Sequence, residues 1–152
     1  MDNSAFRELI YAELSNLTRL SEESKGILSG ISDSPDVATT RAAGSILHDF
    51  YNGVENIFKR IAQTIDCEVP SENHWHKELL ALMTKPTDRR KNAISSELSL
   101  KLKDYLKFRH LYRNTYGFDL SWNELTSLIQ DLGNITAQFK QEIEEFLGNL
   151  QH

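Results

Sequence analysis

Apolar residues recur every three or four positions along most of the chain, which is the periodicity of amphipathic helices. The first such stripe starts near Ser4 and predicts a helix that fades within residues 21–30. A serine followed by a proline, Ser34-Pro35, is a helix start signal and predicts a long second helix that runs to about Asp66. The two stripes comprise Phe6, Ile10, Leu14, Leu17 and Leu20, and then Ala43, Ile46, Phe50, Val54, Ile57, Ile61 and Ile65.

Three more helices are predicted in the second half of the chain. A short helix over 73–83 is followed by a loop over 84–92 and by a helix over 93–115 that stops at Gly117. A capping box at 121–124 begins the last helix. The stripe of that helix comprises Leu125, Leu128, Leu132, Ile135, Phe139, Ile143, Phe146 and Leu150. Strand patterns are scarce, so the sequence predicts an all-α up-and-down helical bundle of four main helices and a short one.

The bulk composition is that of an ordinary globular chain, with 39% apolar and 26% charged residues. A length of 152 residues is enough for one hydrophobic core, so we expect a single domain over 1–152. The one cysteine, Cys67, excludes a disulfide framework within the chain and favours a reducing compartment. The N-terminal residues do not form a signal-peptide pattern, and no apolar run approaches the roughly 20 residues of a membrane span. We therefore expect a cytoplasmic protein.

The charges are distributed unevenly along the chain. Its net charge is −5, yet the segment 85–113 holds nine basic and three acidic residues, a net +6 that leaves −11 for the rest. A basic patch on an acidic body can bind phosphate. A lysine-rich, solvated helix face explains the same composition, and composition alone favours that simpler explanation.

Arg109 lies where the pattern of the 93–115 helix calls for an apolar residue. The stripe advances in steps of four and three residues, so its members are predicted to share one face. They are Leu98, Leu102, Tyr105, Arg109, Tyr112 and Tyr116. Because a guanidinium stays charged and is costly to bury alone, Arg109 must face a carboxylate, a wet cleft, a second subunit or an anionic ligand.

Arg113 follows Arg109 one turn later. Two arginines and two tyrosines on one face would suit phosphate oxygens and stacked bases. A structural ion pair between Arg109 and a glutamate of another helix explains the spacing equally well.

The sequence YLKFRHLYRNTYGFDLSWNELTSLIQDL at 105–132, with ITAQFKQEIEEFL at 135–147, resembles the C-terminal half of HepT-like toxins of the HEPN superfamily. NHWHKELLALM at 73–83 resembles the short middle helix of one HepT-like subgroup. The first half of the chain is similar to the family only in its helical pattern.

The signature of that family is an arginine, four residues, a histidine, one residue and a tyrosine. In this chain Arg109 takes the arginine place, His110 the adjacent polar place and Tyr116 the tyrosine place, whereas Asn114 stands in the histidine place. The resemblance implies a homodimer in which arginine and histidine from both subunits line a cleft where RNA is cut without metal.

The implied reaction is an attack of the ribose 2′-OH on its own phosphate. Histidine titrates near pH 6.5 and can move the proton, and arginine can stabilise the charge on the phosphorane. Asparagine can bind a phosphate but cannot move a proton, so Asn114 is expected to weaken ribonuclease activity. The candidate catalytic residues are Arg109, Asn114 and His110, and the candidate RNA contacts are Lys107, Tyr112 and Arg113.

Two explanations for Asn114 stay open. It is either an engineered His→Asn change that permits expression of a toxic protein, which we slightly favour, or a natural residue. In the second case His110 substitutes for the histidine, or the protein is retained only for binding.

In HepT-like toxins encoded beside a minimal nucleotidyltransferase antitoxin, the signature tyrosine accepts AMP, and the resemblance assigns this role to Tyr116. No cofactor is then expected apart from the ATP and magnesium that the antitoxin uses. The implied partners are RNA, the antitoxin, and a second copy of the chain or a larger hetero-oligomer, and no membrane. The alternatives are a non-catalytic HEPN module that binds RNA or a nucleotide, and a plain interaction bundle in which Arg109 is a structural ion pair.

Other chemistry-bearing residues are interpreted as structural. His74 and His76 are two positions apart, so a helix directs them to different faces, which suits a zinc pair poorly. Cys67 is interpreted as an inert buried thiol and His48 as a satisfied core histidine. The run DRRK at 88–91 is interpreted as a mobile charged loop rather than an RNA contact.

Overall fold

The computed structural model describes residues 3–31 and 35–150 of the chain. These ranges contain the helices α1 (Ser4–Gly30), α2 (Val37–Ile61), α3 (Trp75–Met83), α4 (Ser96–Arg113) and α5 (Trp122–Asn149). A π-helical turn, η1 (Ala62–Asp66), extends α2, and a 3-10 turn, η2 (Gly117–Asp119), precedes α5. Since the described residues form no strand, the prediction of an all-α fold is confirmed.

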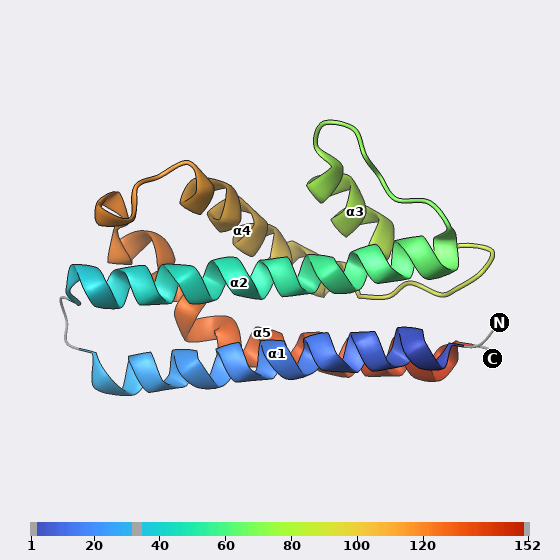
Figure 1. Ribbon diagram of the computed structural model, residues 1–152, viewed down its shortest axis with the longest axis horizontal. Coiled ribbons are helices and arrows are strands. Elements are labelled where there is room, and N and C mark those ends of the chain that lie inside the picture. Colours follow the sequence, from blue (N-terminus) through green and yellow to red (C-terminus); the bar gives the residue numbers. More distant parts are fainter. Residues whose placement is uncertain (1–2, 32–34, 151–152) are drawn as a thin grey trace.

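The four long helices alternate in direction along the chain (Figure 1). α1 and α2 lie antiparallel and in contact, α5 packs along α1, and α4 slants across α2. The short helix α3 packs against the C-terminal part of α2. α1 begins and α5 ends at the same end of the molecule. This is the predicted up-and-down bundle of four main helices and a short one.

α2 is the central helix, because it contacts α1, α3, α4 and α5. Its predicted apolar stripe is buried from Ala43 to Ile61, and Ile65 in η1 is partly buried against the core. Burial of each large apolar side chain stabilises the fold by about 1.5–3 kcal/mol. Among the described residues, no helix is long and apolar enough to cross a membrane.

α1 is longer than its apolar stripe predicts, since it continues past Leu20 to Gly30. Ser21 and Ser24 are buried although they are polar. The Ser24 hydroxyl donates to the Ser21 carbonyl at 2.6 Å, which satisfies the buried oxygen inside the helix itself. Small polar residues therefore continue the inner face where the sequence pattern indicated an end.

The start of α2 differs from the predicted signal. Ser34, the expected N-cap, lies outside the described residues, and Pro35 precedes the helix instead of forming its first turn. The N-cap is Asp36, whose carboxylate accepts a hydrogen bond from the Thr39 amide at 2.8 Å. This hydrogen bond lowers the pKa of Asp36 from its ordinary value. A carboxylate at this position is also favoured by the helix dipole.

α4 begins at Ser96, later than the predicted Ala93. Ala93 and Ile94 are buried, and their amides donate to the Met83 carbonyl at 2.8 and 3.2 Å. These two residues thus attach the end of α3 to the core instead of forming a helical turn.

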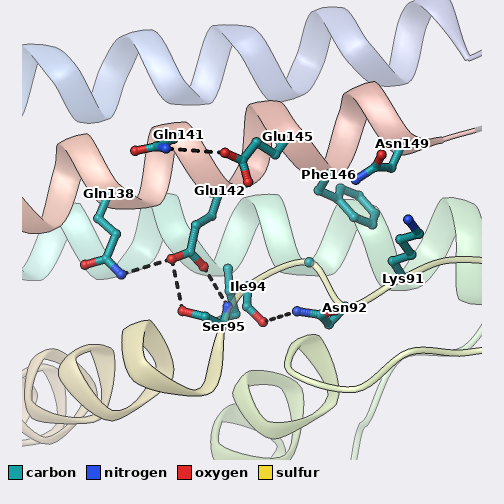
Figure 2. A pocket seen from close by; sticks show the side chains of 11 residues that line it. Lys91, Asn92, Ile94, Ser95, Gln138, Gln141, Glu142, Glu145, Phe146 and Asn149 are labelled. Carbon is teal, nitrogen blue, oxygen red and sulfur yellow. Dashed lines mark hydrogen bonds between the residues drawn. The ribbon is translucent and has the colours of Figure 1, made fainter.

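Glu142 of α5 fixes the start of α4 (Figure 2). Its carboxylate accepts hydrogen bonds from the Ser95 amide at 2.6 Å, the Ser95 hydroxyl at 3.0 Å and the Gln138 amide group at 2.9 Å. The Ser95 hydroxyl oxygen accepts in turn from the Leu98 amide at 3.1 Å and so caps α4. The hollow of about 430 Å³ beside this cap lies roughly 20 Å along α4 from Arg109, at 1.5 Å per residue.

The turn between α4 and α5 differs from prediction at Gly117. α4 ends at Arg113 with Asn114 as its C-cap, and Gly117 starts η2 instead of stopping the helix. Gly117 does not have a positive φ, but a Cβ there would lie 2.9 Å from the Nε of Arg41. α5 begins directly after Ser121, as the capping box predicts, although the Ser121 side chain makes no cap hydrogen bond.

The 84–92 loop is held by a buried ion pair, so the interpretation of DRRK as a mobile charged loop is wrong for Arg90. The Arg90 side chain is fully buried, and its Nε and one terminal nitrogen donate to the two Asp66 oxygens at 2.7 and 2.9 Å. Its other terminal nitrogen donates to the carbonyls of Lys85 and Lys91, both at 3.0 Å. A bidentate pair of this kind fixes the loop against the end of η1.

Cys67 follows η1 in a left-handed backbone conformation, with φ 59°. The residue is exposed, so the interpretation as a buried thiol is wrong. Its sulfur accepts a hydrogen bond from a terminal nitrogen of Arg89 at 3.2 Å.

Replacement of Arg90 by alanine leaves the Asp66 carboxylate buried without its partner. We expect Arg90→Ala to lower the free energy of unfolding by about 3–5 kcal/mol. The matched control is Lys91→Ala, which removes the same charge from an exposed neighbour and should change stability by less than about 0.5 kcal/mol. Urea denaturation of both variants measures the difference, and equal effects would contradict the structural role of Arg90.

Candidate functional site

The inner face of α4 changes from apolar to polar at Arg109. Leu98, Leu102 and Tyr105 are buried, and the Tyr105 hydroxyl donates to the Leu128 carbonyl at 2.8 Å. Burial raises the pKa of Tyr105 well above its ordinary value. The Arg109 side chain, one turn further along, is 12% exposed. Tyr112, a further turn along, is partly buried against the core, so the predicted stripe is correct as far as Tyr112.

Arg109 is held by neutral and charged groups of α2. Its Nε donates to the Asn52 side-chain oxygen at 2.9 Å and lies 4.0 Å from a carboxylate oxygen of Glu55. The second distance exceeds that of a hydrogen bond. Among the described residues, the terminal nitrogens of Arg109 make no hydrogen bond and are not buried without a partner. The guanidinium is thus fixed through one nitrogen, and its two terminal nitrogens have no hydrogen-bond partner among the described residues.

Glu55 is almost completely buried, with a side chain only 3% exposed. Its other carboxylate oxygen lies 2.6 Å from the Nδ1 of His76, at the start of α3. The imidazole of His76 stacks on Trp75, and the ammonium group of Lys59 lies over the Trp75 ring. Glu55 therefore balances the charge of Arg109 from a distance while it makes its short contact with His76.

Tyr51 lies within this buried polar group. It is completely buried, and its hydroxyl has no hydrogen-bond partner among the described residues. Burial, and secondarily the charge of Glu55, raise the pKa of Tyr51 well above its ordinary value, whereas Arg109 opposes the increase. The hydroxyl therefore stays protonated and neutral at physiological pH.

His48 lies at the solvent edge of the same group, one turn before Asn52 on α2. The interpretation as a core histidine does not hold, because its side chain is 23% exposed and contacts the site. Its Nδ1 lies 3.4 Å from the Asn52 amide nitrogen and 3.6 Å from a carboxylate oxygen of Asp49. Its ring stacks on Tyr112 of α4 at a centroid distance of 4.7 Å.

The structure brings Arg109 and Tyr112 together but leaves the other predicted site residues on the exposed surface. Lys107, His110, Arg113 and Asn114 are all exposed. The Asn114 side chain donates to the His110 carbonyl at 2.8 Å and thereby closes the last turn of α4. A histidine that replaces Asn114 would occupy the C-cap position of α4, five residues after Arg109.

Tyr116 lies beyond the end of α4 and not on its inner stripe, which corrects that part of the prediction. It is 73% exposed and stacks in parallel on Phe118, which is 62% exposed, at a centroid distance of 5.3 Å. A hollow of about 560 Å³ adjoins this turn, lined by Arg41, Ala42, Ser45, Tyr112, Thr115, Gly117 and Leu120. The exposed rings and the arginine-lined hollow are thus neighbours.

Sequence reasoning missed Asn52, Glu55 and His76 as members of the site. His48, Asn52 and Glu55 advance by four and three residues, which is the spacing of one helix face. A polar stripe beside the apolar stripe of α2 was therefore visible in the sequence. His76 has no such signal, because α3 approaches α2 only through the tertiary fold.

The geometry of the described residues does not favour a metal site. The described residues contain no group of three or more histidine, cysteine, aspartate or glutamate side chains that could hold one. His74 has a positive φ of 72° before α3, whereas His76 is engaged by Glu55. The arrangement can instead fix an arginine fork beside an aromatic ring and a half-buried histidine.

A protein-family model described as "HepT-like protein" matches residues 42–150, which is more than half of the chain. The matched range contains the whole polar group from His48 to Arg109, together with the Tyr116 turn. Comparisons with curated proteins and with solved structures give no significant match.

Glu55→Ala removes the buried charge nearest to Arg109, and we expect it to lower the free energy of unfolding by about 3 kcal/mol. A double-mutant cycle with Arg109→Met measures the coupling energy between Glu55 and Arg109 apart from the other contacts that Glu55→Ala removes. Because the Nε–carboxylate distance is 4.0 Å, the coupling energy should stay below about 1.5 kcal/mol. A coupling as large as the whole loss in Glu55→Ala would identify Arg109 as a structural ion pair.

Proposed function

The chain belongs to the HepT-like family, and we propose that it acts as the ribonuclease toxin of a HEPN toxin–antitoxin pair. RNA would be cut without metal in a cleft between two copies of the chain. A nucleotidyltransferase antitoxin would silence the toxin by transfer of AMP to Tyr116. The observation that carries the proposal is the fork of Arg109, which is fixed through its Nε and has no hydrogen-bond partner at its terminal nitrogens among the described residues.

The surroundings of Arg109 favour an RNA phosphate as the ligand. Lys107 and Arg113 are exposed on α4, two and four residues from Arg109, and raise the local positive potential. Tyr112, Tyr116 and Phe118 add ring surfaces on which bases can stack. Phosphate contacts would position the strand, and stacking would be tolerant of base identity.

In the proposed reaction the ribose 2′ oxygen attacks phosphorus while Arg109 stabilises the charge on the phosphorane. Asn114 cannot accept the 2′-OH proton, and its side chain is engaged by the His110 carbonyl. We therefore propose that activity is impaired relative to a chain with histidine at this position.

A physical argument favours a site that is shared by two copies of the chain. One arginine with its asparagine and tyrosine is a sparse site for a polyanion, whereas two sets related by a two-fold axis would form a basic groove. The half-exposed edge formed by His48 and Tyr112 would then lie along that groove.

A second candidate function is a non-catalytic HEPN module that binds RNA or a nucleotide. Asn114 supports it, because the residue serves as a helix cap and cannot transfer a proton. In that case the Arg109 fork would bind phosphate without subsequent cleavage.

Asn114→His should restore proton transfer and raise the RNA cleavage rate by about 100-fold or more. A time course with EDTA present compares this variant with the wild-type chain. Arg109→Lys keeps the charge but loses the fork and should lower the rate by about 100-fold, whereas the exposed Arg60→Ala should not change it. RNA binding without cleavage in both the wild type and Asn114→His would favour the binding module.

Tyr116 is the expected acceptor of AMP. Incubation with a minimal nucleotidyltransferase of the antitoxin class, ATP and magnesium should add one or more AMP groups, detected by intact mass. Tyr116→Phe should abolish the labelling, and Tyr11→Phe, at another exposed tyrosine, should not. Added AMP places negative charge near the arginines of the cleft, so RNA cleavage should fall. Labelling that persists in Tyr116→Phe would exclude this residue as the acceptor.

A further inference from the structure

We propose that the hollow beside Gly117 is a nucleotide subsite in which Arg41 of α2 binds a phosphate. The ligand class is a nucleoside monophosphate unit, which a nucleotide of the RNA strand supplies; AMP is the other source of the same chemistry. The inference rests on the proposed function and extends it from Arg109 to a part of α2 that the signature residues do not include.

Arg41 reaches this hollow from the first half of α2, and the residue is exposed. Its side chain lies against Gly117, since a Cβ built at residue 117 would be 2.9 Å from the Arg41 Nε and 3.2 Å from its Cζ. Among the described residues, the guanidinium makes no hydrogen bond and no ion pair. Solvent or a ligand must therefore supply the acceptors for its N–H groups.

The lining of the hollow suits a phosphate. Arg41 is the only charged residue among the described residues that line it, and Ser45, Tyr112 and Thr115 each contribute a hydroxyl group. These hydroxyls have no hydrogen-bond partner in the part of the chain that the structure describes. A guanidinium and hydroxyl groups are the donors that bind phosphate oxygens. The volume of about 560 Å³ lies within the range of roughly 300–1,000 Å³ that is usual for small-ligand sites.

Two other hollows of the described residues are lined by more carboxylates than cations. The hollow of about 430 Å³ contains Glu142 and Glu145 with Lys91. A third hollow, of about 550 Å³, contains one arginine and a set of carboxylates, those of Asp66, Glu68, Glu78 and Asp88. An anion would be repelled from both, whereas the acidic residue of η2, Asp119, does not line the Arg41 hollow.

Tyr112 connects the hollow to the Arg109 site. Its ring lines the hollow and also stacks on His48, whose Nδ1 lies 3.4 Å from the Asn52 amide nitrogen. The oxygen of that amide accepts from the Arg109 Nε. Arg41 precedes Asn52 by 11 residues on α2, which is about 16 Å at 1.5 Å per residue. Because a strand of a few nucleotides spans this distance, one RNA can place one phosphate at Arg109 and another at Arg41.

The test measures the affinity of the full chain for a labelled, uncleavable 2′-O-methyl single-stranded RNA in EDTA at several salt concentrations. Arg41→Gln should weaken binding by about fivefold or more and lower the slope of log affinity against log salt by about 0.7, because one phosphate contact is lost. Arg60→Gln is the matched control, since it removes the same charge from an exposed arginine of the same helix. It should change the affinity by less than about twofold.

Gly117→Ala tests the position of the guanidinium without a change in charge. The φ of Gly117 is not positive, so alanine fits the backbone, and the atoms nearest to the new Cβ all belong to the flexible Arg41 side chain. We expect Arg41 to move and the RNA affinity to fall by about threefold or more, with an unchanged melting temperature. In the Arg41→Gln background, Gly117→Ala should have no further effect. Additive losses would show that Gly117 acts independently of Arg41 and would overturn the subsite.

AMP binding, measured by competition with the RNA and by direct titration, distinguishes the two sources. If Arg41→Gln leaves RNA affinity unchanged but weakens AMP binding, the subsite stands and takes AMP instead of an RNA nucleotide. If both ligands bind Arg41→Gln and Arg60→Gln alike, the subsite is overturned while the proposed function remains. If wild type binds AMP through Arg41 but binds no RNA, the subsite stands and the ribonuclease function fails. If wild type binds neither ligand, both fail.

Discussion

The site depends on the way a charged guanidinium is accommodated on the inner side of a helix. An arginine there would cost several kcal/mol without partners. Asn52 satisfies one nitrogen with a neutral oxygen, and Glu55 supplies a compensating charge at the longer distance of 4.0 Å. This division of tasks differs from a closed salt bridge, in which the carboxylate would occupy the fork. It holds Arg109 in place and leaves its terminal nitrogens without a hydrogen-bond partner among the described residues.

The antiparallel arrangement of α2 and α4 determines which polar residues of the two helices contact each other. Along α2 the steps from His48 to Asn52 and Glu55 follow one face, and along α4 the step from Arg109 to Tyr112 runs in the opposite direction. His48 consequently meets Tyr112, and Asn52 meets Arg109. Both helices are anchored by the apolar core, so the polar contacts are positioned by packing that they do not themselves provide.

Apolar periodicity predicted most of the fold, and its failures have physical causes. The stripes of α2 and α5 are long and regular, and both helices form over these stripes, with Asp36 instead of the predicted Ser34 as the N-cap of α2. The Arg109 anomaly was visible as a cation in an apolar place. The partners of the buried charges could not be predicted from the sequence pattern. The pairing of Arg90 with Asp66, for example, depends on a tertiary contact between residues 24 positions apart.

Local signals failed where a side chain from another element decides the conformation. Gly117 looked like a helix stop but makes room for Arg41, and His48 looked like a core residue but faces the edge of the site. The inner stripe of α4 was extended to Tyr116, although the Asn114 cap ends the helix first. The spacing of residues thus predicts which face they share, whereas the register between two helices decides which of them meet.

Because Tyr116 lies on the surface, a chemical change of its side chain would have little effect on the stability of the bundle. Its ring contacts Phe118, which is itself 62% exposed, and it buries little of its surface. A group attached there would alter the surface beside the arginines without removing a core contact. If Tyr116 accepts AMP as proposed, the modified chain should therefore resist proteolysis as well as the unmodified chain does, so that a cell could hold a stable reserve of modified protein rather than having to degrade it and synthesise it again.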